Sequence, residues 1–204
     1  MKPHRFSLKG AEWLKSINLI GVVAGILMIV LPFAGPWWRL TVGTEAVDVA
    51  FSPFNINMTA LGQPIESTLA RYICFGVALT VIIAGIFVLL ASILPKRWWS
   101  NRLIRFGATK VLWMVVMLLV LITLMALVVN KFIVAKTPEL EEFSMPYISG
   151  STTSTLHVGD ATITLPIAVS LAWPFVLAII TAAFGLAARI YHRRFVKPLK
   201  PSKG

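Results

Sequence analysis

Residues 72–95 read YICFGVALTVIIAGIFVLLASILP, a run of 24 residues without a charged side chain. A bilayer core about 30 Å thick needs ~20 apolar residues of helix, so this run is long enough to span a membrane. Three further uncharged runs of 20 residues or more cover 16–38, 111–130 and 161–188. Together with a composition that is 57% hydrophobic and 13% charged, they predict a helical membrane protein with a four-helix transmembrane bundle. A soluble enzyme, a secreted disulfide scaffold and a disordered tail are excluded.

The basic residues predict the orientation of the four spans. Fifteen of the 19 Lys and Arg residues lie in the N-terminal segment, the middle connection and the C-terminal tail, whereas seven of the eight acids lie in the other two connections. Short loops rich in Lys and Arg stay on the cytoplasmic side. We therefore expect a multi-pass protein of the cell membrane with both termini cytoplasmic.

The first run has an alternative interpretation as a cleaved signal peptide, because basic residues precede it and Ala34-Gly35 follow it. Its apolar part is about 18 residues long, against the 7–15 of a typical signal, which favours a span. The resulting plan has nine segments. They are a cytoplasmic N-terminus (1–15), helix one (16–35), an outer β segment (36–68), helix two (69–94), a basic and aromatic cytoplasmic loop (95–110), helix three (111–134), a second outer β segment (135–165), helix four (166–190) and a cytoplasmic tail (191–204).

Small residues spaced along the helices are typical of close packing between membrane helices. The candidates for such packing are Gly21, Gly25, Gly76, Ala84 and Gly185. Packing within the bundle is the ordinary interpretation, and a dimer face that includes Gly21 and Gly25 is the alternative. No predicted span carries an ionisable residue near its middle, although proton relays and ion-coupled transporters usually need one.

The loop at 95–106, PKRWWSNRLIRF, mixes basic and aromatic side chains. We expect it to lie along the cytoplasmic headgroups and to bind anionic lipid. The formal charge of +11 raises the possibility of nucleic acid, but the nearest anion for such a loop is its own membrane, so no nucleic-acid partner is predicted.

The two outer segments show strand-like patterns. Alternation at 47–51 and turn residues such as Gly43 and Pro53 indicate strands in the first. In the second, 154–158 and 161–165 flank Gly159-Asp160, which predicts a two-residue hairpin. An isolated hairpin is barely stable in water, so we expect one small extracellular β-sheet of three to five strands built from both outer segments.

Motifs for chemistry are absent. Cys74 is the only cysteine, which excludes an intrachain disulfide and a Cys-x-x-Cys pair. No phosphate loop or hydrolase motif occurs, so no enzyme and no cofactor is predicted. The acids Glu139, Glu141 and Glu142 have the chemistry for a hard cation, but such a run is more often a solvated loop, and we expect no metal. Asn57-Met58-Thr59 is a possible glycosylation site.

The turn Gly35-Pro36-Trp37-Trp38-Arg39-Leu40-Thr41 resembles the claudins, in which Pro-x-Trp-Arg opens the first extracellular segment. The resemblance implies four helices, cytoplasmic termini and a sheet over the bundle, with Trp38 anchoring that sheet at the membrane surface and Arg39 in the following position. The two cysteines that claudins bridge in the sheet have no counterpart here.

These features predict a claudin-like membrane protein that acts without catalysis. We expect lateral self-association, contact with a neighbouring cell surface or service as an accessory subunit, so the partner is a second copy or another membrane protein. The alternative is a small oligomeric channel or transporter subunit. Candidates for outer-surface contact are Trp37, Trp38, Arg39, Phe51, Phe54, Glu139, Glu141 and Glu142, although interfacial anchoring is the more ordinary role for the two tryptophans.

Overall fold

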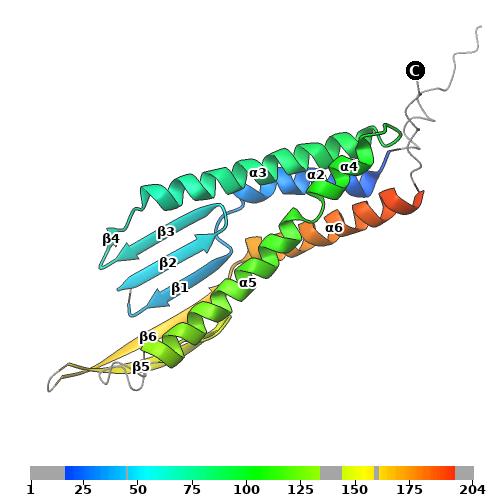
Figure 1. Cartoon of the computed structure of the whole chain (residues 1–204). Coiled ribbons are helices and arrows are strands. Elements are labelled where there is room, and N and C mark those ends of the chain that lie inside the picture. The colour runs from blue at the N-terminus through cyan, green and yellow to red at the C-terminus, as the bar shows by residue number, and fades with distance from the viewer. Residues whose placement is uncertain (1–16, 45, 134–143, 159–160, 196–204) are drawn as a thin grey trace, which may run out of the picture. The chain divides into compact units, whose positions relative to one another are not determined.

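The computed structural model describes residues 17–44, 46–133, 144–158 and 161–195 (Figure 1). The chain divides into two compact units. The basic unit comprises residues 1–30, 81–111 and 181–204, and the sheet unit comprises residues 31–80 and 112–180.

Apolar helices occupy all four uncharged runs, but the helix of the first run is shorter than a predicted span. The helices of the described chain are α2 (Leu19–Val30) with a short 3-10 turn (Leu31–Phe33), α3 (Thr68–Ile93), α4 (Ser100–Gly107), α5 (Lys110–Val128) with a π-helical turn (Val129–Ile133), and α6 (Trp173–Phe195). Three stretches, Thr68–Ile93, Ser100–Lys131 and Trp173–Phe195, have the length and composition to cross a membrane, and Leu19–Phe33 is a shorter apolar helix. The protein is therefore a helical protein suited to a membrane.

The strands form one antiparallel sheet in the order β4-β3-β2-β1-β6-β5. Their bounds are β1 Trp38–Val42, β2 Val47–Ser52, β3 Asn55–Ala60, β4 Gln63–Pro64, β5 Gly150–Val158 and β6 Ala161–Leu171. Because β1 pairs with β6, from Trp38 opposite Leu171 to Val42 opposite Ile167, the prediction of a sheet shared by both segments is confirmed. The sheet has six strands rather than three to five.

Helix four begins later than expected. Strand β6 continues to Leu171 and α6 starts at Trp173, whereas the sequence placed the helix start at 166. Apolar and small or polar residues alternate through 163–171, a strand period, and every residue from Ile167 to Leu171 is paired with β1. Pro174 lies in the first turn of α6, where a missing N–H does no harm. Its position is therefore compatible with the start of this helix.

The predicted hairpin is present in the strand pairing. Strands β5 and β6 pair from Gly150 opposite Val169 to Val158 opposite Ala161, while Gly159-Asp160 lies outside the described residues. The segment before β5 is tied to the end of α5. Asn130 Nδ2 donates to Met145 O (2.9 Å), and Met145 N donates to Asn130 Oδ1 (2.8 Å).

The core of the sheet unit is aromatic. Trp37 is fully buried, and its ring meets Phe54 edge-on at 5.5 Å and Phe175 of α6 at 6.1 Å between centroids. Ser52 holds Phe54 in place, because its Oγ accepts hydrogen bonds from the backbone N–H groups of Phe54 (3.3 Å) and Asn55 (3.0 Å). The Ser52 side chain thus positions Phe54 for its contact with Trp37.

Candidate functional site

The basic unit contains a helix where the sequence predicted only a loop. Helix α4 has two chemically different sides: Ser100, Ile104 and Gly107 are buried, whereas Asn101, Arg102, Arg105 and Phe106 are exposed. Buried residues three and four apart place one stripe of a helix against its own unit. The polar and aromatic residues are therefore presented outward together.

The start of α4 is fixed by Ser100, whose side chain is fully buried. Its Oγ lies 2.7 Å from Pro95 O, 2.8 Å from Arg97 O and 3.2 Å from His192 Nε2 of α6. The Ser100 hydroxyl donates to a backbone carbonyl and is also hydrogen-bonded to the His192 imidazole. The pair thus fastens α4 to α6.

A serine beside an imidazole is also the pairing used in nucleophilic catalysis. Here Ser100 is 0% and His192 is 1% exposed. A substrate carbonyl has no route to the hydroxyl oxygen in this arrangement. The geometry therefore supports a structural role for the pair.

The other end of α4 is fixed by close backbone contact. A Cβ added to Gly107 would lie 2.7 Å from Ala84 O and 2.6 Å from Val88 Cγ2, both on α3, so only glycine permits this approach. Between the two ends, Ile104 is fully buried. Three buried residues therefore fix which side of α4 packs against its own unit and which side is exposed.

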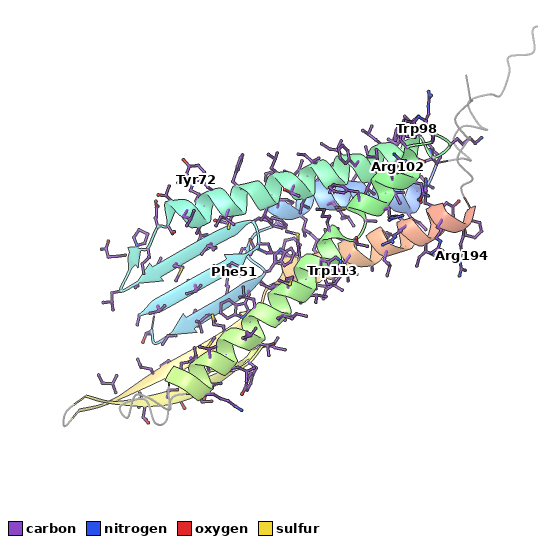
Figure 2. All side chains as sticks on the ribbon, viewed as in Figure 1. Phe51, Tyr72, Trp98, Arg102, Trp113 and Arg194 are labelled. Atoms are coloured by element: carbon purple, nitrogen blue, oxygen red, sulfur yellow. The ribbon has the colours of Figure 1, made fainter. Side chains whose placement is uncertain are left out.

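Cations and aromatic rings alternate around α4. The Arg102 guanidinium lies 5.6 Å from the centroid of the Trp98 ring, and Lys110 Nζ lies 4.5 Å from that of Phe106. Trp98 is 55% and Phe106 is 51% exposed. Trp98 and Arg102 both project outward from this segment (Figure 2). Such cation–π pairs hold the rings and charges side by side at the surface.

A shallow hollow of about 390 Å³ opens on this side of the helix. Its lining consists of Asn101, Arg102, Arg105 and Phe106. Two guanidinium groups and an amide supply hydrogen-bond donors, and no carboxylate lies among the lining residues. The hollow is therefore suited to an anion.

A second cluster, centred on Asn18, joins three helices of the basic unit. Asn18 is 1% exposed and caps α2, because its Oδ1 accepts a hydrogen bond from Gly21 N (3.1 Å). Its Nδ2 donates to Ala188 O of α6 (3.2 Å), and its backbone N–H donates to Ser92 O at the end of α3 (3.0 Å). One polar residue thereby sets the starting point of α2 against both neighbours.

Four of the five small residues singled out in the sequence lie inside the basic unit. Gly21 contacts the side chain of Ser92, and a Cβ on Gly185 would lie 2.5 Å from Ala108 O. Gly25 packs against Gly85: a Cβ added to either glycine would lie 2.9 Å from the carbonyl oxygen of the other. Ala84 is fully buried. The structure uses these residues within one chain, which leaves Gly21 and Gly25 unavailable as a dimer face.

Gly76 differs from the other glycines singled out in the sequence, since a Cβ there would meet nothing within 4 Å among the described residues. It lies in the first half of α3, where most side chains are exposed, including Tyr72 at 72%. The expected packing role is therefore not seen at Gly76.

Some of the predicted outer-surface contact residues on the sheet are buried, and others are exposed. Trp37, Trp38 and Phe54 are 0%, 3% and 7% exposed, so they are core residues and not contact residues, which corrects the expectation. Pairing of β1 on both sides brings Trp38 between Phe51 and Leu171. Phe51 is half-buried, whereas Arg39 and Asn57 are exposed. Glu139, Glu141 and Glu142 lie outside the described residues.

Among the residues that the structure describes, no group of three His, Cys, Asp or Glu side chains lies close enough to hold a metal ion. Cys74 is a buried free thiol on α3. A scan against protein-family models found no matching family, and a search of curated proteins found no match.

Sequence reasoning missed Asn18, Ser100 and His192. Asn18 had a usable signal, since Asn is a favoured N-cap and it stands directly before the apolar run of α2. The contact between Ser100 and His192 had none, because 92 positions separate the two residues.

Proposed function

We propose that the protein is a multi-pass membrane protein that acts without catalysis, by contacts made through the polar face of its sheet. The partner is a second copy of the chain, a neighbouring surface or another membrane protein. The observation that supports this proposal is the chemical difference between the two faces of the sheet.

The polar face carries mainly Ser, Thr and Asn side chains, together with alanines, a proline and two charged residues. Cross-strand pairing places Arg39, Ala50 and Asn57 in one row and Thr41, Asp48 and Thr59 in the next. The same face continues onto the other strands with Ser151, Thr153, Thr164, Pro166, Ala168 and Ser170, all of which are exposed.

The opposite face is apolar. Trp38, Ile167 and Val169 are at most 3% exposed, and they share this face with Leu40, Val42, Val47, Val49, Phe51, Ile56 and Met58. One face therefore closes the core of the sheet unit and leaves the other for contact. A surface of Ser, Thr and Asn suits adaptable hydrogen bonding with a protein partner.

The proposed orientation has α4, both termini and the basic unit on the cytoplasmic side, with the sheet outside. The concentration of basic residues in 95–110 and in the tail supports it, as does the exposed position of Asn57 in a glycosylation triplet. We also propose a distant claudin-like relationship, supported by apolar helices combined with a sheet built from both connecting segments.

Site-directed cross-linking tests the sheet proposal. The chain has one cysteine, so Cys74→Ala provides a clean background. Asn57→Cys places a thiol on the polar face, and Met58→Cys, the neighbouring residue on the apolar face and 37% exposed, is the matched control. A short bis-maleimide applied to native membranes should link Asn57→Cys to a second copy or to another protein and leave Met58→Cys unlinked.

Absence of any cross-link at Asn57→Cys, together with quantitative labelling of that thiol by a monofunctional maleimide, would count against the polar face. Ion flux through the purified protein in liposomes would instead favour the channel alternative.

A further inference from the structure

We propose that the hollow on α4 is a binding site for the phosphate of an individual anionic phospholipid. This inference rests on the proposed membrane setting, with α4 at the cytoplasmic headgroups, and deepens it from a general attraction to a built site. It does not depend on any role of the sheet.

The described part of the basic unit carries only positive formal charges. Its described residues include eight Lys and Arg and no Asp or Glu. The basic residues are Lys96, Arg97, Arg102, Arg105, Lys110, Arg189, Arg193 and Arg194. The sequence of the whole unit has fifteen Lys and Arg against a single acid, Glu12, so most of the counter-charge comes from outside, and a bilayer supplies it as lipid phosphate.

The position of the hollow relative to the membrane follows from the junction at Asn18. Asn18 at the start of α2 is hydrogen-bonded to Ser92 O on α3 and to Ala188 O on α6, so these three positions lie at the same level of the unit. Each of these residues lies within three positions of the charged end of its uncharged run. This level therefore marks the border between apolar and polar parts of the unit.

Helix α4 crosses that border. At its end, Gly107 packs against Val88 and Ala84, inward of Ser92 along α3. At its start, Ser100 contacts His192, outward of Ala188 along α6. The residues between them, which line the hollow, lie at the border itself. The polar headgroup layer begins there, since it surrounds a hydrocarbon core about 30 Å thick.

The lining of the hollow contains two arginines that suit a phosphate. Arg102 and Arg105 are three residues apart, so they lie on one side of the helix. Each guanidinium has a planar fork of N–H groups that matches the oxygens of a phosphate. Because α4 is anchored at Ser100, Ile104 and Gly107, the backbone positions that carry the two arginines are fixed within the unit.

The aromatic residues favour a lipid over a free phosphate or a nucleic acid. Trp98 and Phe106 expose more than half of their surface beside the two arginines. Aromatic rings next to Lys and Arg are typical of helices that lie in the membrane interface. A lipid satisfies both features, because its phosphate meets the arginines while its glycerol and upper chains cover the rings.

Native mass spectrometry in mild detergent tests the site, with phosphatidylglycerol and phosphatidylcholine titrated separately. The variant Arg102→Gln/Arg105→Gln removes the site, and Arg193→Gln/Arg194→Gln is the matched control, because it removes two exposed charges from α6 of the same unit. A charge-assisted hydrogen bond to the phosphate contributes at least about fivefold in affinity, so loss of both arginine contacts should weaken phosphatidylglycerol binding by the α4 variant about 30-fold. The control should change less than about threefold, and phosphatidylcholine binding should stay constant.

Equal losses in the two variants would overturn the proposal, since diffuse attraction depends on charge and not on position. Displacement of the lipid by millimolar inorganic phosphate would overturn the assignment to a lipid, and so would retention of nucleic acid that disappears in the α4 variant. Arg102→Lys/Arg105→Lys keeps the charge and loses the forked geometry, so it should weaken binding measurably. Because Arg102 and Arg105 are exposed, the melting temperature without anionic lipid should be unchanged in every variant, which separates binding from folding.

Discussion

Replacing Asn18 by alanine should loosen the basic unit at the level where α2, α3 and α6 meet. The side chain makes two hydrogen bonds, a cap to Gly21 N (3.1 Å) and an interhelical bond to Ala188 O (3.2 Å). Loss of an Asn cap costs about 1 kcal/mol, and an interhelical hydrogen bond in a membrane protein contributes about 0.6 kcal/mol. The backbone bond to Ser92 O survives the substitution. We therefore expect a loss of about 1.5–2 kcal/mol in the free energy of unfolding.

The contributions of the cap and the interhelical bond separate in a second variant. Serine is also a favoured cap, but its hydroxyl is too short to reach Ala188 O from the same position. Asn18→Ser should therefore lose only about 0.6–1 kcal/mol. Asn57→Ala is the control, because Asn57 is exposed on β3 and surface substitutions usually stay within about 0.5 kcal/mol.

The assay is equilibrium unfolding in mixed micelles of mild detergent and dodecyl sulfate, followed by tryptophan fluorescence. A free energy for Asn18→Ala within about 0.3 kcal/mol of the parent protein would refute a stabilising role for the junction. If Asn18→Ser were as unstable as Asn18→Ala, the cap would not be the larger of the two contributions.

Three further predictions use the same assay. Gly85→Val should lower the free energy of unfolding by at least about 1–3 kcal/mol, because its Cβ would lie 2.9 Å from Gly25 O. Gly76→Ala should raise it by about 0.5–1 kcal/mol, since no described atom lies within 4 Å of the new Cβ and alanine favours helix. Similar effects at both glycines would contradict the packing. Trp37→Ala should cost about 3–5 kcal/mol through loss of the buried ring. Trp37→Phe should cost clearly less, since the buried Nε1 has no hydrogen-bond partner among the described residues; equal costs would argue against the edge contacts with Phe54 and Phe175. Leu61→Asn should stabilise the turn between β3 and β4 by up to about 1 kcal/mol, because Leu61 has φ +50° and Asn tolerates this conformation better. A loss of stability would show that the exposed leucine makes a favourable contact.

The uncharged runs were sufficient to predict the apolar helices, because spanning a bilayer needs only length and composition. The shared sheet was also predictable in outline, since neither connecting segment could stabilise its strands alone. The start of α6 was not predicted: residues 163–171 alternate with a strand period, but they also belong to an uncharged run long enough to be read as a helix. Pairing with β1 decided between them, and that pairing joins parts of the chain more than a hundred residues apart.

The functional surfaces show the same division. By itself, the sequence determined where the basic and aromatic residues concentrate, because charge and hydropathy are properties of local composition. Only the tertiary structure decided which of them are exposed together. It buries Trp37 and Trp38 among strands and the start of α6, and it presents Arg102, Arg105 and Phe106 on one side of a helix anchored by Ser100, Ile104 and Gly107. Burial depends on partners that are distant in the chain, and no local pattern specifies those partners.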